Sequence, residues 1–384
     1  MKDSPIRQLL PNRAYTAVEW FRREQKELFA RSWTFACMAE DLKEAGDYLC
    51  TEVAAHPIIL LRDREGKLRA FHNVCRHRLS RLLEGRGTLT RAITCFYHGW
   101  SYDLTGALVA VPYERTRFDE VDKSCLGLVP VQIGEWKNLV FVNPDPKAES
   151  LEAWLDDLPT RCGPHRPERL VEVADVRYRH RANWKILIEN FMDGYHLVPL
   201  HGRSIPDGDF STMKFSSGGR HWSNYRGVKE GRVSGNDLFP MIEGVPGDFG
   251  ANYHLLFPNL CVFETATTWM TFHAIPIAPG VTDAHVRIRT APEALDRKTQ
   301  APVDESRPLP KAVVHAKGPY SGMRVNLPDL HPLESMSVML EDIYACEAMQ
   351  QGLESDVCGI GAMCDLEAPV AFFQQRVLDH LGTL

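Results

Sequence analysis

The spacing of apolar residues changes twice along the chain, and each change predicts a different kind of structure. The first segment has helical spacing, because a capping box of Thr16 and Glu19 precedes an apolar stripe that reaches Trp33. Further on, the apolar residues form short runs between turn residues, and the clearest runs are 58–61, 68–71 and 139–142. Such runs are typical of strands, so this stretch predicts a small all-β domain, to which we assign residues 37–150.

The remaining sequence, residues 1–36 and 151–384, mixes the two spacings. Residues 184–198 and 335–353 have the spacing of amphipathic helices, and the stretch between them is rich in predicted strands. The sequence therefore predicts an α+β protein, in which the small all-β domain accompanies a larger domain built from the two flanking segments.

Composition narrows the class of protein without identifying it. The 384 residues carry a formal net charge of -6, so no basic field attracts nucleic acid. No apolar run in the sequence approaches the roughly 20 residues that span a bilayer, and the N-terminal sequence lacks the apolar stretch of a signal peptide. Ten dispersed cysteines do not indicate a disulfide framework. We therefore expect a cytoplasmic protein that binds neither nucleic acid nor membrane.

Two cysteines stand close to histidines in a repeated pattern. Cys75-x-His77 is followed by Cys95-x-x-His98. Structural zinc sites usually pair Cys with Cys and His with His along the chain, whereas here each segment offers one of each. That distribution suits a two-iron cluster in which one iron takes both thiolates and the other takes both imidazoles, which is the Rieske [2Fe–2S] pattern. A structural zinc site is the alternative.

A second group of candidate ligands lies on and just after the helix predicted at 184–198. The residues that share one face of this helix, at i, i+4 and i+7, are Glu189, Asp193 and His196. On a straight helix His201 would point about 140° away from His196. We expect Pro199 to disrupt the helix, so that both imidazoles converge on one metal. The alternative is a buried helix whose histidines make internal hydrogen bonds.

Non-heme iron(II) oxygenases bind their iron through two histidines and one carboxylate, and this set of ligands leaves positions on the iron open for O₂ and substrate. The two histidines therefore need a carboxylate from elsewhere in the chain. Asp342 is a candidate because it shares a face of the predicted helix 335–353 with Cys346. A metal would satisfy a carboxylate that is otherwise costly to bury. Glu341 is its rival, and Asp356 is a third candidate.

These motifs resemble the α (terminal oxygenase) subunits of Rieske non-heme iron oxygenases, of the aromatic-ring-hydroxylating and choline–glycine-betaine monooxygenase types. Residues 70–108 resemble their Rieske domain, with Leu79 where the family usually has glycine, and residues 189–201 are similar to their E-N-x-x-D-x-Y-H-x₄-H motif. The resemblance implies a larger domain with an antiparallel sheet flanked by helices. It also implies a set of cluster ligands, Cys75, His77, Cys95 and His98, and a set of iron ligands, His196, His201 and Asp342.

The same resemblance implies supporting roles near the iron. Asp193 would hydrogen-bond between a cluster histidine of one subunit and His196 of the next, in a homotrimer with or without a β subunit (α3 or α3β3). Asn190 and Tyr195 would surround the iron site.

The implied activity is oxygenation of a small organic substrate by mono- or dioxygenation or by oxidative N-demethylation. O₂ would be the cosubstrate, and NAD(P)H would act only through a separate reductase, with or without a ferredoxin. The sequence lacks a G-x-G-x-x-G fingerprint, so the chain itself is not expected to bind the nucleotide. A Rieske electron carrier without oxygenase activity and a zinc-stabilised binding protein are the other hypotheses.

The sequence leaves the substrate open between an aromatic compound and a quaternary ammonium. Arg220 or Arg226 could anchor a carboxylate. The aromatic residues that could form a cage for a cation are Trp222, Tyr225, Phe263, Trp269 and Phe272.

Overall fold

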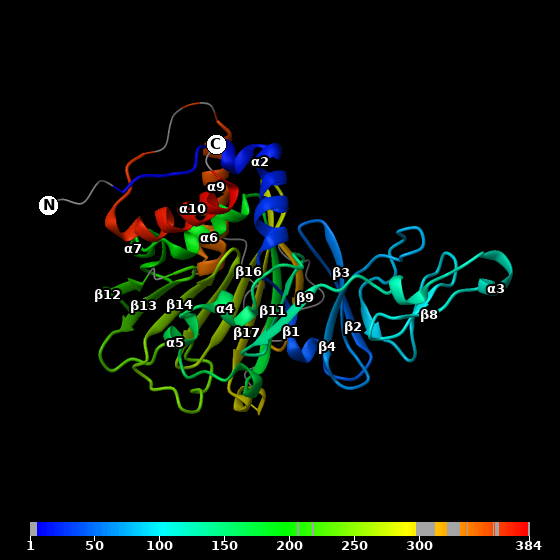
Figure 1. Cartoon of the computed structure of the whole chain (residues 1–384). Helices are drawn as coiled ribbons and strands as arrows, with labels where there is room; N and C mark the ends of the chain where they lie inside the picture. Colours follow the sequence, from blue (N-terminus) through cyan, green and yellow to red (C-terminus); the bar gives the residue numbers. More distant parts are fainter. Residues whose placement is uncertain are drawn as a thin grey trace. The chain divides into compact units, whose positions relative to one another are not determined.

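The computed structural model describes residues 6–205, 207–216, 219–296, 312–320, 331–335, 337–355, 357 and 361–382. The chain forms two compact units (Figure 1). One is the continuous segment Gln25–Trp154, and the other combines Met1–Glu24 with Leu155–Leu384. No helix in the described part of the chain is long and apolar enough to cross a membrane.

The continuous unit is built from three small antiparallel sheets, whose strand orders are β1-β10-β9, β4-β3-β2-β5 and β6-β7-β8. The strands are β1 (Thr34–Met38), β2 (Asp47–Val53), β3 (His56–Arg62), β4 (Leu68–His72), β5 (Arg86–Thr88), β6 (Ile93–Thr94), β7 (Ser101–Tyr102), β8 (Leu108–Ala110), β9 (Gln132–Trp136) and β10 (Leu139–Asn143). It also contains the short helix α3 (Glu114–Arg117), and α4 (Leu151–Leu155) begins in this unit and ends at the first residue of the next segment of the other unit. The three apolar runs of the sequence thus lie on β3, β4 and β10, as predicted.

Strand β3 shows why the run at 58–61 is apolar throughout. Successive side chains of a strand point to opposite faces. Ile59 and Leu61 belong to one buried apolar cluster, and Ile58 and Leu60 belong to another. The strand therefore separates two cores, and every position in the run is buried.

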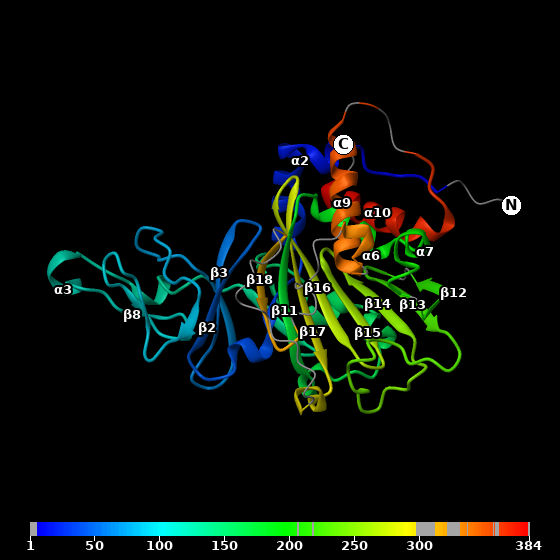
Figure 2. The same ribbon diagram turned by 180° about the vertical axis from the view of Figure 1, so that it is seen from behind.

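The second unit is organised around an eight-stranded antiparallel sheet with the order β12-β13-β14-β15-β16-β17-β11-β18. The strands are β11 (Val171–His180), β12 (Gly208–Ser216), β13 (Trp222–Val228), β14 (Ala251–Leu256), β15 (Leu260–Thr265), β16 (Trp269–Ala278), β17 (Val281–Thr290) and β18 (Val313–Lys317). The helices are α1 (Arg13–Thr16), α2 (Val18–Arg23), α5 (Leu158–Arg161), α6 (Trp184–Met192), α7 (Leu197–His201), α9 (Val338–Glu354) and α10 (Ala368–Leu381). Helices α6, α9 and α10 gather beside the sheet (Figures 1 and 2). The predicted α+β fold, with an antiparallel sheet flanked by helices, is confirmed.

The helix predicted at 184–198 is wrong in its second half. Helix α6 ends at Met192, and the short helix α7 begins at Leu197. The reason lies in Asp193, whose Oδ1 accepts a hydrogen bond of 2.6 Å from the Tyr195 N–H and so closes a local turn. Pro199 does not break a helix, because it lies in the first turn of α7, where its missing N–H is not required.

The predicted capping box near the N-terminus is also wrong. Helix α1 ends at Thr16, and α2 begins at Val18 without a side-chain cap. The Thr16 hydroxyl instead donates to the Asn12 carbonyl at 3.3 Å. Thr16 is the last residue of α1, so the N-cap position of α2 falls on Ala17, which has no side-chain oxygen to accept a hydrogen bond.

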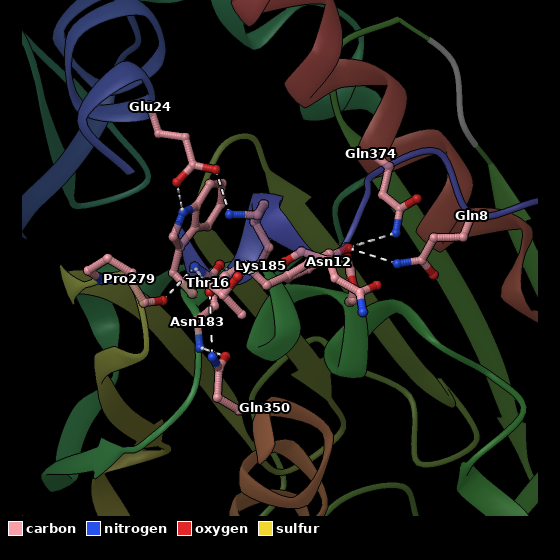
Figure 3. A network of polar contacts seen from close by, with 12 residues as sticks. Gln8, Asn12, Thr16, Glu24, Asn183, Lys185, Pro279, Gln350 and Gln374 are labelled. Atoms are coloured by element: carbon pink, nitrogen blue, oxygen red, sulfur yellow. Dashed lines mark hydrogen bonds and ion pairs between the residues drawn. The ribbon is translucent and has the colours of Figure 1, made fainter. Parts of the chain in front are cut away.

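A buried polar network joins the N-terminal segment to α6 and α10 (Figure 3). Lys185 Nζ lies 2.5 Å from Glu24 Oε1, and both side chains are fully buried. Glu189 accepts hydrogen bonds from the Tyr15 hydroxyl at 2.7 Å and from Gln374 Nε2 at 3.0 Å. Burial raises the pKa of Glu189 to about 7, and these two hydrogen bonds oppose the shift. The network therefore fixes α6, the helix that leads into the candidate iron site.

Candidate metal centres and substrate cavity

The two segments that carry the cluster motif fold into loops with the same hydrogen-bond pattern. In each loop the cysteine N–H donates to the carbonyl five residues later, and the cysteine carbonyl accepts from the N–H four residues later. The distances are 2.8 Å from Cys75 N to Ser80 O, 3.0 Å from Leu79 N to Cys75 O, 2.8 Å from Cys95 N to Trp100 O and 2.9 Å from Gly99 N to Cys95 O. The backbone thus presents Cys75 and Cys95 equivalently.

This shared pattern places Leu79 and Gly99 at equivalent positions, and both have positive φ, 59° and 72°. Glycine suits that conformation, and at Gly99 a Cβ would lie 2.9 Å from the Pro112 ring. Leu79 occupies the left-handed region at a steric cost, and its side chain is 75% exposed. The departure from the family pattern at Leu79 therefore changes the side chain and leaves the loop conformation as it is.

The side chains of the motif fit a Rieske cluster. The ring centroids of His77 and His98 are 4.5 Å apart, and His77 stacks on Trp100. Cys75 and Cys95 are buried, and the Tyr102 hydroxyl lies 3.3 Å from Cys75 Sγ. Burial and then the nearby His98 and Arg78 lower the pKa of His77, which favours the neutral imidazole that binds metals. Paired imidazoles and buried thiols are the donors that such a cluster requires.

The second candidate centre is formed by His196, His201 and Asp342. One donor atom from each lies within 4.8 Å of the other two. Asp342 Oδ1, from α9, is 2.8 Å from His201 Nε2 and 3.8 Å from His196 Nε2. His196 and His201 stand at the two ends of α7, so this short helix turns both imidazoles toward α9. Two imidazole nitrogens and one carboxylate oxygen are the donor set of a non-heme iron site.

A carboxylate also faces the outer nitrogen of each imidazole. Asp193 Oδ2 is 3.2 Å from His196 Nδ1, and Glu341 Oε2 is 2.6 Å from His201 Nδ1. Ser204 donates to the same Glu341 oxygen at 2.5 Å. Such contacts fix the orientation of metal-binding imidazoles. Glu341, the rival of Asp342 as ligand, therefore lies on the far side of His201 from the donor group.

The electrostatics of the site favour a cation. Burial lowers the pKa of His201, but hydrogen bonds and charges from Asp342 and Glu341 outweigh burial and raise it overall. The negative potential that raises this pKa is the potential that would hold a divalent metal ion.

The other predicted site residues have different surroundings. Asn190 lines the same cavity as His196, His201 and Asp342. Tyr195 is 58% exposed and contacts Asp193 through its backbone N–H. Asp356 lies outside the described residues. The roles of Asn190, Tyr195 and Asp193 stay predictions.

Sequence reasoning missed His180. This residue ends β11, is 1% exposed and lines the same cavity as Asp342. Burial lowers its pKa to about 4, so the ring is neutral at ordinary pH. The alternation of buried and exposed side chains along β11 could have identified it, because His180 follows Val176 and Tyr178 on the buried face of the strand.

The candidate donor group of His196, His201 and Asp342 borders a cavity of about 460 Å³. Its aromatic lining comes from Phe191, Phe239, Tyr253, Phe263, Phe272 and Tyr320. Of the five aromatic residues expected there, Phe263 and Phe272 are in this lining. Trp222 and Trp269 are buried core residues, and Tyr225 is partly exposed. Arg226 lines the cavity, whereas Arg220 is not among its lining residues.

A paired-loop cluster site and a two-histidine, one-carboxylate site on an eight-stranded antiparallel sheet together have the plan of a Rieske non-heme iron protein. The family described as the ring hydroxylating alpha subunit (catalytic domain) matches residues 167–383, more than half of the chain, and the Rieske [2Fe–2S] domain matches residues 32–131. The chain therefore belongs to the ring-hydroxylating alpha-subunit family. Membership confirms the predicted cofactors, a Rieske [2Fe–2S] cluster and a mononuclear iron.

Among similar sequences is the carnitine monooxygenase oxygenase subunit of Escherichia coli K12, which is 38% identical over 199 residues, covering 50% of this chain and 52% of the relative. The alignment with that relative therefore spans only about half of its length. The chloroplastic choline monooxygenase of Beta vulgaris is 28% identical over 355 residues, covering 90% of this chain and 70% of the relative. The large oxygenase component of the naphthalene 1,2-dioxygenase system of Pseudomonas aeruginosa is 31% identical over 236 residues, covering 55% and 53%.

Solved structures agree in fold. A quaternary ammonium Rieske monooxygenase superposes with a TM-score of 0.75 at 24% identity, covering 97% of this chain and 95% of that chain. Naphthalene 1,2-dioxygenase from a Rhodococcus species superposes with a TM-score of 0.72 at 21% identity, covering 97% and 94%.

Proposed function

We propose that this chain is the terminal component of an oxygenase that uses O₂ and electrons from a separate NAD(P)H-dependent reductase, with or without a ferredoxin, to oxidise a small organic substrate. The observation that carries the proposal is that His196, His201 and Asp342 all line the aromatic cavity. A metal held by these donors would meet a substrate in a space of substrate size. A Rieske electron carrier has no need of such a cavity.

The residues of the chain have separable tasks in this function. When bound, the Rieske cluster supplies electrons and the mononuclear iron supplies O₂ activation. His196, His201 and Asp342 would hold the iron from one side and leave the cavity side open. Glu341 holds His201 in orientation through Nδ1, and Asp193 does the same for His196. The aromatic walls exclude water from the reacting substrate.

Asp193 has a further proposed role, because its carboxylate is 20% exposed while it contacts His196. We assign it the bridge to a cluster histidine, His77 or His98, of a neighbouring subunit in a homotrimer. A closed head-to-tail ring would bring one subunit's cluster to the next subunit's iron. A β subunit and a cytoplasmic location belong to the same proposal.

The relatives named for carnitine, choline and naphthalene support a substrate of the quaternary ammonium or aromatic class. Hydroxylation, as monooxygenation or dioxygenation, is the proposed reaction. The product of this reaction is a hydroxylated compound. If the hydroxylated carbon is a methyl group attached to nitrogen, the outcome is N-demethylation.

The test is incorporation of labelled oxygen. Iron-loaded protein, a surrogate Rieske reductase and NADH are incubated under ¹⁸O₂ with a panel of aromatic acids, betaines and neutral aromatics, and products are analysed by mass spectrometry. We expect ¹⁸O in the product of at least one substrate, and none with the Asp342→Asn variant although its cluster remains. Reduction and reoxidation of the cluster without labelled product would make the protein an electron carrier, and a colourless purified protein would favour the zinc-stabilised binding protein.

A further inference from the structure

The cavity contains a buried positive charge that the iron chemistry does not use. Arg226 lies on β13, lines the cavity and is only 7% exposed. Burying a guanidinium without an anionic partner is unfavourable by several kcal/mol, as an order of magnitude. Its neighbours should therefore show what it is for.

No described carboxylate forms an ion pair with Arg226, and its Nε and Nη1 atoms are buried without a hydrogen-bond partner among the described residues. The other buried arginines of the sheet differ, because Arg287 and Arg289 both pair with Glu172. Asp207, which also lines the cavity, is paired with Arg232 at 3.3 Å. Arg226 thus lines the cavity and carries two hydrogen-bond donor atoms, Nε and Nη1, that no described residue satisfies.

The chain makes room for this guanidinium. A Cβ on Gly208, on the neighbouring strand β12, would collide with Arg226 Nη1. Gly208 is not among the residues with positive φ, so its backbone does not need glycine. The absence of a side chain at position 208 instead leaves space for Arg226.

An aromatic wall continues from Arg226 toward the helix that carries Asn190. The Arg226 guanidinium carbon lies 5.9 Å from the Tyr253 ring centroid. The Tyr253 ring is 4.8 Å from that of Phe263 and 5.8 Å from that of Phe191, which in turn stacks on Phe272 at 6.1 Å. A ligand in this cavity therefore meets a cation at one end and aromatic faces along its body.

We propose that Arg226 binds the carboxylate of the substrate, and that this oxygenase acts on small carboxylates whose other end, an aromatic ring or a quaternary ammonium, packs on Tyr253, Phe263 and Phe191. The planar fork of a guanidinium donates two parallel hydrogen bonds to a carboxylate, which fixes orientation as well as position. This inference rests on the proposed oxygenase function and narrows its substrate class.

The experiment measures binding, without turnover, to the iron-loaded and oxidised protein by isothermal titration at constant ionic strength. Two isosteric pairs are compared: benzoate with benzamide, and glycine betaine with its amide. We expect at least one acid to bind at least about 10-fold more tightly than its amide, the size of effect given by a hydrogen bond to a charged group. The preferred pair then distinguishes the aromatic from the quaternary ammonium class.

Variants connect this preference to Arg226. Arg226→Gln should bring the affinity for the acid down to that for the amide, and Gly208→Ala should weaken acid binding without removing the charge. Arg179→Gln is the matched control, because it removes one charge from a half-exposed arginine of the same sheet that pairs with Asp283. It should preserve the preference for the acid.

Equal binding of acid and amide in both pairs, or an undiminished preference in Arg226→Gln, would overturn the assignment. The unsubstituted protein alone decides the first point, so the inference is testable even if a variant fails to fold. Labelled product from neutral substrates only would overturn the role of Arg226 and leave the oxygenase. Absence of labelled product from every substrate would instead count against the proposed function.

Discussion

Replacing Glu341 by glutamine should weaken iron binding without removing a ligand. Glu341 Oε2 is 2.6 Å from His201 Nδ1, and the two side chains are only 3% and 1% exposed, so water does not screen the contact. A hydrogen bond to a charged group contributes about 1.5–3 kcal/mol. Since about 1.4 kcal/mol corresponds to a tenfold change in an equilibrium constant, we expect Fe²⁺ affinity to fall about 10- to 100-fold, the usual range for such contacts. Glu341→Ala should lose more, because no acceptor remains for the His201 N–H.

The assay is competition for Fe²⁺ between the protein and a chelator of known affinity, with the Rieske cluster followed separately by its visible absorption. Glu334→Gln is the control. Glu334 lies shortly before α9 and is exposed, and its substitution removes the same charge as Glu341→Gln does. Unchanged Fe²⁺ affinity in Glu341→Gln would refute the positioning role. If Glu341→Gln abolished iron binding while Asp342→Asn retained it, Glu341 would be the ligand and Asp342 would not.

Three further outcomes are expected. Cys95→Ser should abolish the visible absorption of the Rieske cluster while Fe²⁺ still loads at the mononuclear site; a variant with full absorption would remove Cys95 from the ligand set. Asp193→Asn should leave both metals in place but slow reoxidation of the reduced cluster by O₂ and substrate, as measured by stopped-flow absorbance, and reoxidation at the normal rate would count against the bridge. Burial raises the pKa of Glu189 to about 7, so the folded state binds this proton more tightly than the unfolded state does. The resulting stabilisation is complete below about pH 4.5, and it decreases by about 1.4 kcal/mol per pH unit as the pH rises to about 7. Glu189→Gln should remove that slope from urea unfolding measured between pH 5 and 7, and an identical slope in the variant would show that Glu189 does not titrate in this range.

Local patterns predicted which residues form the two candidate donor groups. The Cys–His pairs and the His196–His201 pair lie close together in sequence, so their spacing alone indicated which side chains could meet. The end of α6 was not predictable in this way, because helical periodicity continues past Met192 and does not register the turn that Asp193 closes. Helical spacing alone did not decide whether Glu341 or Asp342 is the carboxylate ligand, because the two residues are adjacent and only about 100° apart around the helix. The choice of Asp342 depended on the family resemblance.

The cavity walls were harder to predict, because they depend on which face of each strand turns toward the candidate iron site. Trp222 and Trp269 are of the residue type that forms binding cages for cations, yet both are buried in the core of the sheet. Phe191 and Tyr253 line the cavity instead, from a helix and a strand far apart in sequence. Strand register and the packing of α6 on the sheet decide this arrangement, and neither is encoded in the spacing of a single segment.

The division of the chain into one continuous and one interrupted unit sets an order for its assembly during synthesis. Residues Gln25–Trp154 contain all the strands of the Rieske unit, so this unit can fold as soon as Trp154 has emerged from the ribosome. The other unit must wait, because the Tyr15 hydroxyl accepts a hydrogen bond from Gln374, 359 residues later. Until α6 is made, Glu24 has no Lys185 to neutralise it. During synthesis, the continuous Rieske unit is thus completed first, and the unit with the eight-stranded sheet closes only after α10 has been made.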